Sequence, residues 1–456
     1  MVSRFLGSVF RGGSIIGEKA KEMKRMIVDR LVTWIAAFRR RSFMRVIQQT
    51  LSVLFPFVLL GSLAQVIAQS CLTRQGFFNY LLRIDRWLPH FQAVYYSFDN
   101  FAGLTVGIVA LLAAYQSARY TAKLYRRDSA AAGLTALIAF LLLSSRYMKA
   151  AVEGLDSRFL GFGGLLLGLI IGYVVGQIFR LCGRPLQRES RIDSVTIIKR
   201  TFDSFWAILV ALGGAFLLNK LLILILFYNW STSISSAVAG SVNRHHGLGM
   251  TLVFSAFTAL CAWFGANGPY SSMAPSNGYT VNLNAALIHH SSWNVPYKYC
   301  DYSLYHAFAS VGGTGATLAL LIAIALVARQ RANHRVARWT VLPTLLNSNS
   351  AVMMGIPLLF NPVFLIPMVG VPLLNVLLAA GAVFVHLIPP VVYPVPTGTP
   401  GLLVAFIGSN GNWMTLVVTA VILVVDVACY IPFVRLAERV TARMAVQERR
   451  REHHAD

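Results

Sequence analysis

The sequence predicts an all-α polytopic membrane protein with about ten transmembrane helices and additional re-entrant hairpins. Of its 456 residues, 56% are hydrophobic and only 12% are charged, whereas soluble proteins carry about 25% charged residues. The charges lie between long apolar runs, and 40 Lys and Arg against 17 Asp and Glu give a net charge of +23. Because basic residues concentrate in the cytoplasmic loops of membrane proteins, this excess indicates membrane orientation, and we expect no nucleic-acid partner.

Separate apolar runs of about membrane-spanning length predict the individual helices. In chain order they are Ile47–Ser70, Phe101–Ala118, Ala130–Ser145, Phe159–Phe179, Ser204–Trp230, Gly247–Phe264 and Leu304–Ala328. The apolar stretch 341–433 is too long for one crossing and must hold several elements. If each of these apolar runs crossed the membrane once, in alternating directions, the basic residues 329–338 would lie outside the cell. Basic residues favour the cytoplasmic side, so we expect an extra crossing or a re-entrant turn within residues 265–303.

Basic segments predict that both termini lie in the cytoplasm. Arg39, Arg40 and Arg41 stand immediately before the first apolar run, and a basic tail follows the last one. Residues 18–38 carry apolar side chains at helical spacing among charges, which predicts an amphipathic helix on the inner membrane surface in contact with anionic lipids. A solvated basic arm is the alternative interpretation of the same segment.

The stretch 341–433 combines helix-breaking residues with small polar ones. It holds eleven of the 17 prolines, and broken backbone at membrane depth persists only where it is buried in protein or lines a watery cavity. Neutral amides and hydroxyls suit a polyol such as a sugar, so this stretch is the predicted solute path. The alternative is that these groups cap turns and touch no solute. The candidate substrate-binding residues here are Asn347, Asn349, Ser350, Asn361 and Thr399.

A second candidate segment is 263–269, where two glycines permit a tight break beside Asn267 and Gly268. His289 and His290 lack a third ligand at metal spacing, so we expect no metal site and no cofactor. The glycine-rich run 312–315 is predicted to serve close helix packing. Asp426, in the middle of an apolar run, suits either a proton or cation site or a structural pairing.

The run 346–362, LNSNSAVMMGIPLLFNP, resembles the pattern FNxNEPxxFGxPxxxNP of the membrane subunit IIC of the bacterial phosphotransferase system, lactose/cellobiose/diacetylchitobiose branch. Residues 264–268 are similar to the family's FGIHG, residues 312–317 to its GGSGxTL, and residues 396–413 to its WTTPxxxGxxxxxGGDW. The segment that begins at Asp193 is similar to PDSVP followed by SFxALIP. The resemblance covers roughly residues 45–437 in matching order.

This resemblance implies an elevator-type fold and a homodimer in the bacterial cell membrane. Residues 47–230 would form the scaffold and dimerisation domain, and residues 247–436 the substrate domain with its re-entrant hairpins. Residues 1–46 would be a cytoplasmic basic arm, and residues 437–456 a cytoplasmic tail. The chain would be at most the permease component of a sugar phosphotransferase, with no catalytic residue of its own and with separate IIA and IIB proteins as phosphoryl donors.

Two positions depart from the family pattern at the predicted sugar site. The family's histidine in FGIHG corresponds to Asn267, and the glutamate in NxNEP corresponds to Ser350. Neither side chain can act as a general base at neutral pH. Three functions remain open: a sugar permease subunit with altered substrate or phosphorylation chemistry, a non-phosphorylating transporter or exporter of another solute, and a membrane sensor or scaffold without transport.

Overall fold

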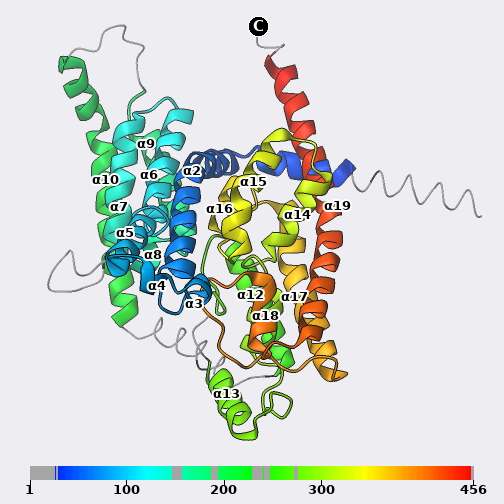
Figure 1. Cartoon of the computed structure of the whole chain (residues 1–456). Coiled ribbons are helices and arrows are strands. Elements are labelled where there is room, and N and C mark those ends of the chain that lie inside the picture. The colour runs from blue at the N-terminus through cyan, green and yellow to red at the C-terminus, as the bar shows by residue number, and fades with distance from the viewer. Residues whose placement is uncertain are drawn as a thin grey trace, which may run out of the picture.

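The computed structural model describes Met26 and residues 29–145, 157–185, 194–227, 240, 247–271 and 276–452. Every regular element in these ranges is a helix. Extended pairing within the same ranges is confined to two isolated bridges, Gly76 with Thr397 and Gly164 with Ala266. The predicted all-α class is therefore confirmed (Figure 1).

Five helices are long and apolar enough to cross a membrane. They are α2 (Ser42–Cys71), α9 (Leu165–Cys182), α17 (Pro362–Phe384) and the apolar parts of α10 (Ser194–Phe227) and α19 (Trp413–Glu452). Shorter apolar helices are α7 (Ser129–Ser144), α12 (Leu248–Trp263) and α14 (Thr317–Val327). These helices fit an integral membrane protein, while the expected number of about ten crossings stays a prediction.

One group of helices forms around α6 (Val109–Leu124), which packs against α7 and α9, while α10 covers α7 and α9. Small residues bring α6 and α9 close together: a Cβ at Gly168 would lie 2.2 Å from the Ala110 carbonyl oxygen, and one at Gly172 would lie 2.3 Å from the Ala114 carbonyl oxygen. Such contacts let helix backbones approach in a bilayer, where no hydrophobic effect drives them together.

A second group of helices forms around α17, which packs against α12, α19 and the π-helix η1 (Tyr302–Ala309). This group also contains α15 (Arg331–Leu345), α16 (Ser350–Gly355) and α18 (Gly401–Gly408). The helix α2 lies between the two groups (Figure 1), because it packs against α6 on one side and against α15 and α16 on the other. The roles assigned to residues 47–230 and 247–436 stay predictions.

Short helices connect the longer ones along the chain. α3 (Phe77–Leu82), α4 (Ile84–Trp87) and α5 (Phe91–Gly103) follow α2, α8 (Ser157–Leu160) precedes α9, and α13 (Asn277–His289) precedes η1. The expected single helix Phe101–Ala118 is wrong, because α5 ends at Gly103 and α6 begins only at Val109. Gly107 lies against the backbone of Gly103, where a Cβ would come within 2.3 Å of the Gly103 carbonyl oxygen.

The chain reverses direction directly after α12. The Tyr270 backbone N–H donates to Thr258 Oγ1 over 3.1 Å, and the rings of Phe254 and Tyr270 lie 5.8 Å apart, so the returning segment runs back along α12. This reversal lies within residues 265–303, where we expect an extra crossing or a re-entrant turn, and its place relative to the membrane stays a prediction. The following helix α13 lies at the end of the bundle opposite the C-terminus (Figure 1).

The expected continuous helix Leu304–Ala328 is also wrong. η1 ends at Ala309, and α14 begins at Thr317. Gly312, Gly313 and Gly315 have φ values of 81°, 97° and 88°, which a right-handed helix cannot contain. The run 312–315 is therefore an irregular loop within the second helix group, and helix packing does not account for it.

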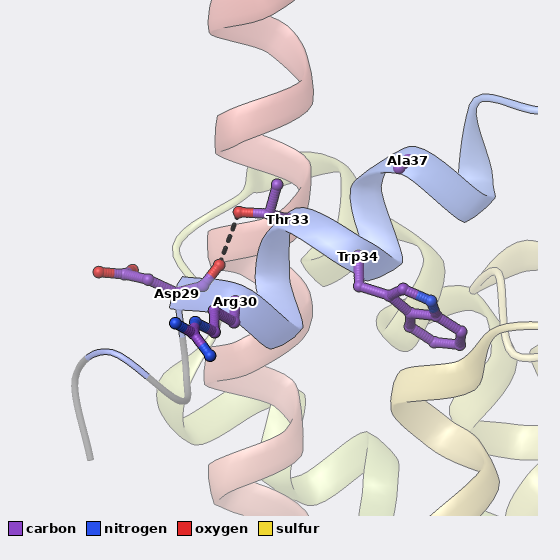
Figure 2. A pocket seen from close by; sticks show the side chains of 5 residues that line it. All are labelled: Asp29, Arg30, Thr33, Trp34 and Ala37. Carbon is purple, nitrogen blue, oxygen red and sulfur yellow. Dashed lines mark hydrogen bonds between the residues drawn. The ribbon is translucent and has the colours of Figure 1, made fainter. Parts of the chain in front are cut away.

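The amphipathic segment near the N-terminus is described only in part: residues 29–39 are helical, while residues 18–25 and 27–28 of the predicted helix lie outside the described residues. Val32, Ile35 and Ala36 are buried in the central core, and Trp34 is 60% exposed. Figure 2 shows Trp34 beside a shallow hollow also lined by Asp29, Arg30, Thr33 and Ala37. One face of this helix thus packs on the protein and another is open, while its contact with anionic lipid stays a prediction.

Replacing Gly313 by alanine should destabilise the protein. The left-handed backbone costs an L-residue about 1–2 kcal/mol, and the new Cβ would lie 2.7 Å from Asn349 Cγ. We expect a lower apparent melting temperature in detergent, followed by intrinsic fluorescence. Gly370→Ala in α17 is the matched control, because its Cβ would meet no atom within 4 Å. Equal melting temperatures for the two variants would contradict this reading of the loop.

Candidate functional site

The loop 312–315 is held by side chains that come from later parts of the chain. Asn347 Oδ1 accepts a hydrogen bond from the Gly312 backbone N–H over 2.8 Å. Asn349 Nδ2 donates to the Thr314 carbonyl oxygen over 3.1 Å. The Tyr430 hydroxyl of α19 donates to the carbonyl oxygen of Gly315. Two of the sequence-predicted site residues therefore meet at one broken stretch of backbone.

Asn347 also reaches a third segment of the chain. Its Nδ2 donates to the Thr399 carbonyl oxygen over 3.4 Å, so a single amide joins the loop 312–315 to the segment before α18. Its backbone has a φ of 63°, a conformation that asparagine tolerates better than most residues. A Cβ at Gly401 would lie 2.6 Å from Asn347 Oδ1, which leaves little free space around the amide oxygen.

Thr399 is 3% exposed, and its hydroxyl donates to the Pro396 carbonyl oxygen over 2.7 Å. The neighbouring residues contact α2 and α3. Ser70 Oγ donates to the Gly398 carbonyl oxygen over 3.0 Å, and the Phe77 backbone N–H donates to the Thr397 carbonyl oxygen over 3.0 Å. The segment that contains Thr399 therefore links α18 to the end of α2.

Asn361 belongs to a second junction, at the start of α17. Its Oδ1 accepts from the Val363 backbone N–H over 3.2 Å, which makes Asn361 the N-cap of that helix. Its Nδ2 donates to the Pro357 carbonyl oxygen over 2.8 Å, and its own carbonyl oxygen accepts from Trp263 Nε1 over 3.1 Å. Both polar atoms of the Asn361 side chain therefore hold the turn together. This agrees with the alternative interpretation that these polar groups cap turns and touch no solute.

Asn267 lies in the turn after α12, close to the start of α9. A Cβ at Gly163 would lie 2.3 Å from Asn267 Nδ2, and the Leu166 backbone N–H donates to the Gly265 carbonyl oxygen over 3.3 Å. Gly268 lies against α12, where a Cβ would come within 2.4 Å of Thr258 Cα. Glycine is therefore required at position 268 by close packing.

Two of the seven predicted residues keep unused polar groups. Within the described part of the chain, the side chains of Asn267, which is exposed, and Ser350, which is half-buried at the start of α16, form no hydrogen bond. Their amide and hydroxyl remain available to a solute. The described residues contain no group of three His, Cys, Asp or Glu side chains that could hold a metal ion.

Sequence reasoning missed two aromatic residues that organise these junctions. Tyr430 supports the loop 312–315, and Trp263 donates to Asn361 and packs against Phe360 with ring centroids 6.0 Å apart. Each combines a large apolar body with one polar atom, which a buried position must satisfy. Both residues lie within or beside apolar runs that are interrupted by proline or glycine. This position in the sequence could have identified them.

Comparison with known proteins identifies the family. The profile "Phosphotransferase system, EIIC" matches residues 48–372. The oligo-beta-mannoside-specific EIIC component of Bacillus subtilis is 24% identical over 92% of this chain and 96% of its own length. The cellobiose-specific EIIC component of Lactococcus lactis is 36% identical, over 29% of this chain and 27% of its own length.

Longer relatives match in part. The lactose-specific EIICB component of Streptococcus mutans is 25% identical over 66% of this chain, which spans only 53% of that relative's length. Among solved structures, the transporter ChbC, the IIC component from the N,N'-diacetylchitobiose-specific phosphotransferase system, matches with a TM-score of 0.40 and 19% identity over 90% of this chain and 96% of ChbC. Because the family profile covers well over half of the sequence, this chain belongs to the EIIC family of the phosphotransferase system.

Proposed function

We propose that this EIIC subunit conducts an uncharged di- or oligosaccharide through the second helix group, beside the turn after α12 and the start of α16. EIIC components of the phosphotransferase system are sugar permeases that work with separate or fused IIA and IIB partners. The relatives are named for oligo-beta-mannoside, cellobiose and lactose, which are neutral polyols. The observations that carry the proposal are two neutral polar side chains that form no hydrogen bond within the described part of the protein, Asn267 in the turn after α12 and Ser350 at the start of α16.

The phosphorylation step is proposed to be altered in this chain. In the resembling family pattern, a histidine and a glutamate occupy the positions of Asn267 and Ser350. An amide and a hydroxyl can hold sugar hydroxyls by hydrogen bonds, but they cannot accept a proton as general bases at neutral pH. The same observation favours a second candidate function, a facilitator or exporter that moves its solute without phosphorylating it.

The double variant Asn267→His with Ser350→Glu should raise phosphorylation of a transported sugar. Vesicles containing the protein would receive radiolabelled cellobiose together with phosphorylated IIA and IIB proteins, and sugar phosphate and total flux would be measured separately. We expect more sugar phosphate than in the wild type, because a general base returns to the site. The matched control is Asn100→His with Ser97→Glu, the same two changes on exposed positions of α5.

The outcomes of this experiment separate the candidate functions. Flux without sugar phosphate in both proteins would support the facilitator or exporter. Saturable binding without flux would support the sensor or scaffold and contradict transport. An equal gain in the α5 control would show that the effect does not arise at the proposed site.

We infer that a second copy of the chain packs on the first helix group. Large apolar side chains of α10 face away from the helices on which it packs, and Phe202, Trp206 and Leu217 are 72%, 66% and 69% exposed. A helix in a bilayer also tolerates such exposure, and the family resemblance independently implies a homodimer. Native mass spectrometry from lipid nanodiscs should give the mass of a dimer, and a purely monomeric spectrum would contradict it.

Both termini are proposed to lie in the cytoplasm. Residues 29–39 and the end of α19 lie at the same end of the bundle (Figure 1). Basic segments that are distant in the sequence contact one another. The Arg127 guanidinium donates to the Arg180 carbonyl oxygen over 3.0 Å, which joins the segment after α6 to the end of α9. The Arg329 backbone N–H donates to Glu438 Oε1 over 2.6 Å, which joins the segment before α15 to α19. Such clustering of basic residues follows the positive-inside rule.

A labelling experiment tests this orientation. Cys182 is exposed at the end of α9, and with the other four cysteines replaced it should react with a membrane-impermeant maleimide only after intact spheroplasts are permeabilised. The matched variant carries His289→Cys in a background without cysteines. Because α13 lies at the opposite end of the bundle, this variant should react before permeabilisation. The reverse pattern would invert the proposed orientation.

A further inference from the structure

A buried polar pair joins α17 to α19. Asn375 of α17 and Asp426 of α19 are both 0% exposed. Asn375 Nδ2 donates to Asp426 Oδ2 over 2.8 Å and to the Phe308 carbonyl oxygen over 3.4 Å. Phe308 lies in η1, so the pair connects three helical elements of the second group. π-Helical turns such as η1 occur frequently at functional sites.

The remaining oxygen atoms of the pair, Asn375 Oδ1 and Asp426 Oδ1, are buried without a hydrogen-bond partner. Among the described residues, the salt bridge that the structure contains joins Arg184 and Asp203, so Asp426 has no cationic partner there. An ionised carboxylate in such surroundings is strongly disfavoured unless its charge is compensated. The pair as it stands therefore lacks one positive charge or one proton.

The elements packed against α19 bring no compensating charge. The helices α14, α17 and α18 contain no titratable side chain. On α19 itself, the titratable neighbours of Asp426 are Cys429 and Tyr430, neither of which can become cationic. Neither Cys429 nor Tyr430 therefore supplies the positive charge that an ionised Asp426 would need.

The π-helix η1 contributes Tyr302, Tyr305 and His306. The His306 ring is enclosed by aromatic rings, with the Tyr305 centroid at 5.3 Å and the Tyr302 centroid at 6.4 Å. No ion pair joins His306 to Asp426 within the described part of the protein. His306 therefore does not neutralise the pair.

A proton fits this site better than a metal cation. Metal ions such as Ca²⁺ and Mg²⁺ take about six or more oxygen ligands. Here the Phe308 carbonyl oxygen and Asp426 Oδ2 already accept from Asn375 Nδ2, and only two oxygens remain unpartnered. A proton needs one oxygen that carries it and one that accepts from it, and the pair leaves two oxygens without a hydrogen-bond partner, Asp426 Oδ1 and Asn375 Oδ1.

We propose that Asp426 is a proton-binding site, in which a proton taken from water resides on Oδ1 and is donated to Asn375 Oδ1. This bond and the existing Nδ2 to Oδ2 bond then form a cyclic acid–amide pair that locks α19 to α17. Release of the proton to water leaves a carboxylate oxygen facing an amide oxygen, and the contact between the helices weakens.

The site is mechanically connected to the candidate functional site. Tyr430 lies one helical turn after Asp426, and its hydroxyl donates to the carbonyl oxygen of Gly315 in the loop that Asn347 and Asn349 hold. Proton occupancy at Asp426 therefore acts on the position of that loop. This proton site is independent of which solute the protein carries and of whether that solute is phosphorylated.

Infrared difference spectroscopy of the full chain in lipid nanodiscs tests the proposal. The wild type should show the carbonyl stretch of a protonated carboxylic acid in apolar surroundings, and this band should disappear as the pH is raised. Asp426→Asn should remove the band. Asp203→Asn is the matched control: it makes the same change at a carboxylate paired with Arg184 near the surface, and the band should remain.

Thermal unfolding gives a second readout. Because the folded state favours the protonated form of Asp426, its stabilisation is present at low pH and is lost as rising pH removes the proton. The apparent melting temperature of the wild type should fall as the pH rises from the ordinary range of an aspartate pKa toward the pH at which the band disappears, and this contribution should level off above that pH. Asp426→Asn should lose that part of the pH dependence, since its amide can donate to Asn375 Oδ1 at any pH.

Two results would overturn the proposal. One is a wild type that shows no such band at any pH at which it stays folded, a measurement that needs no variant. The other is a band that sodium chloride abolishes while choline chloride does not, with a sodium-dependent rise in melting temperature, which would identify a cation site. If Asp426→Asn does not fold, Asn375→Leu replaces it and should shift the frequency of the band by removing its acceptor.

Discussion

Backbone polar groups inside an apolar helix bundle have to find hydrogen-bond partners within the protein, and the breaks in the second helix group depend on this constraint. Asn347 supplies an acceptor to Gly312 and a donor to Thr399, and Asn349 and Tyr430 complete the loop 312–315. Each buried group left without a partner would cost about 1–3 kcal/mol. Amide side chains serve this purpose well because each can both donate and accept.

The same constraint decides which polar groups can serve a solute. Asn347, Asn349, Asn361 and Thr399 use their side chains to hold loops and helix ends. The unengaged side chains among the predicted residues are those of Asn267 and Ser350, where the resembling family has ionisable groups. The structure therefore concentrates the free polar chemistry at the two positions where this sequence departs from its family's pattern.

The sequence predicted the membrane class and the family well, because both are spread over hundreds of residues. It also predicted a broken second half, since proline and glycine limit the backbone wherever they occur. It failed at Phe101–Ala118 and Leu304–Ala328, where apolar composition concealed breaks between helices. Apolar composition indicates only that a segment lies in an apolar environment. Whether a glycine in that segment adopts a positive φ depends on contacts with residues that are distant in the sequence. The capping role of Asn361 was likewise undetermined until its partners in space were known.

The contact between the segment 396–399 and α2 has a consequence for any relative motion of the two helix groups. Thr397 exchanges backbone hydrogen bonds with Gln75 and Phe77, and Ser70 donates to Gly398. A rigid-body displacement of α18 away from α2 has to break these three bonds, each contributing about 1 kcal/mol net. These bonds therefore favour the arrangement in which the segment 396–399 stays against the end of α2. A solute would separate the two segments only by binding a separated arrangement more tightly, by a free energy of the same size.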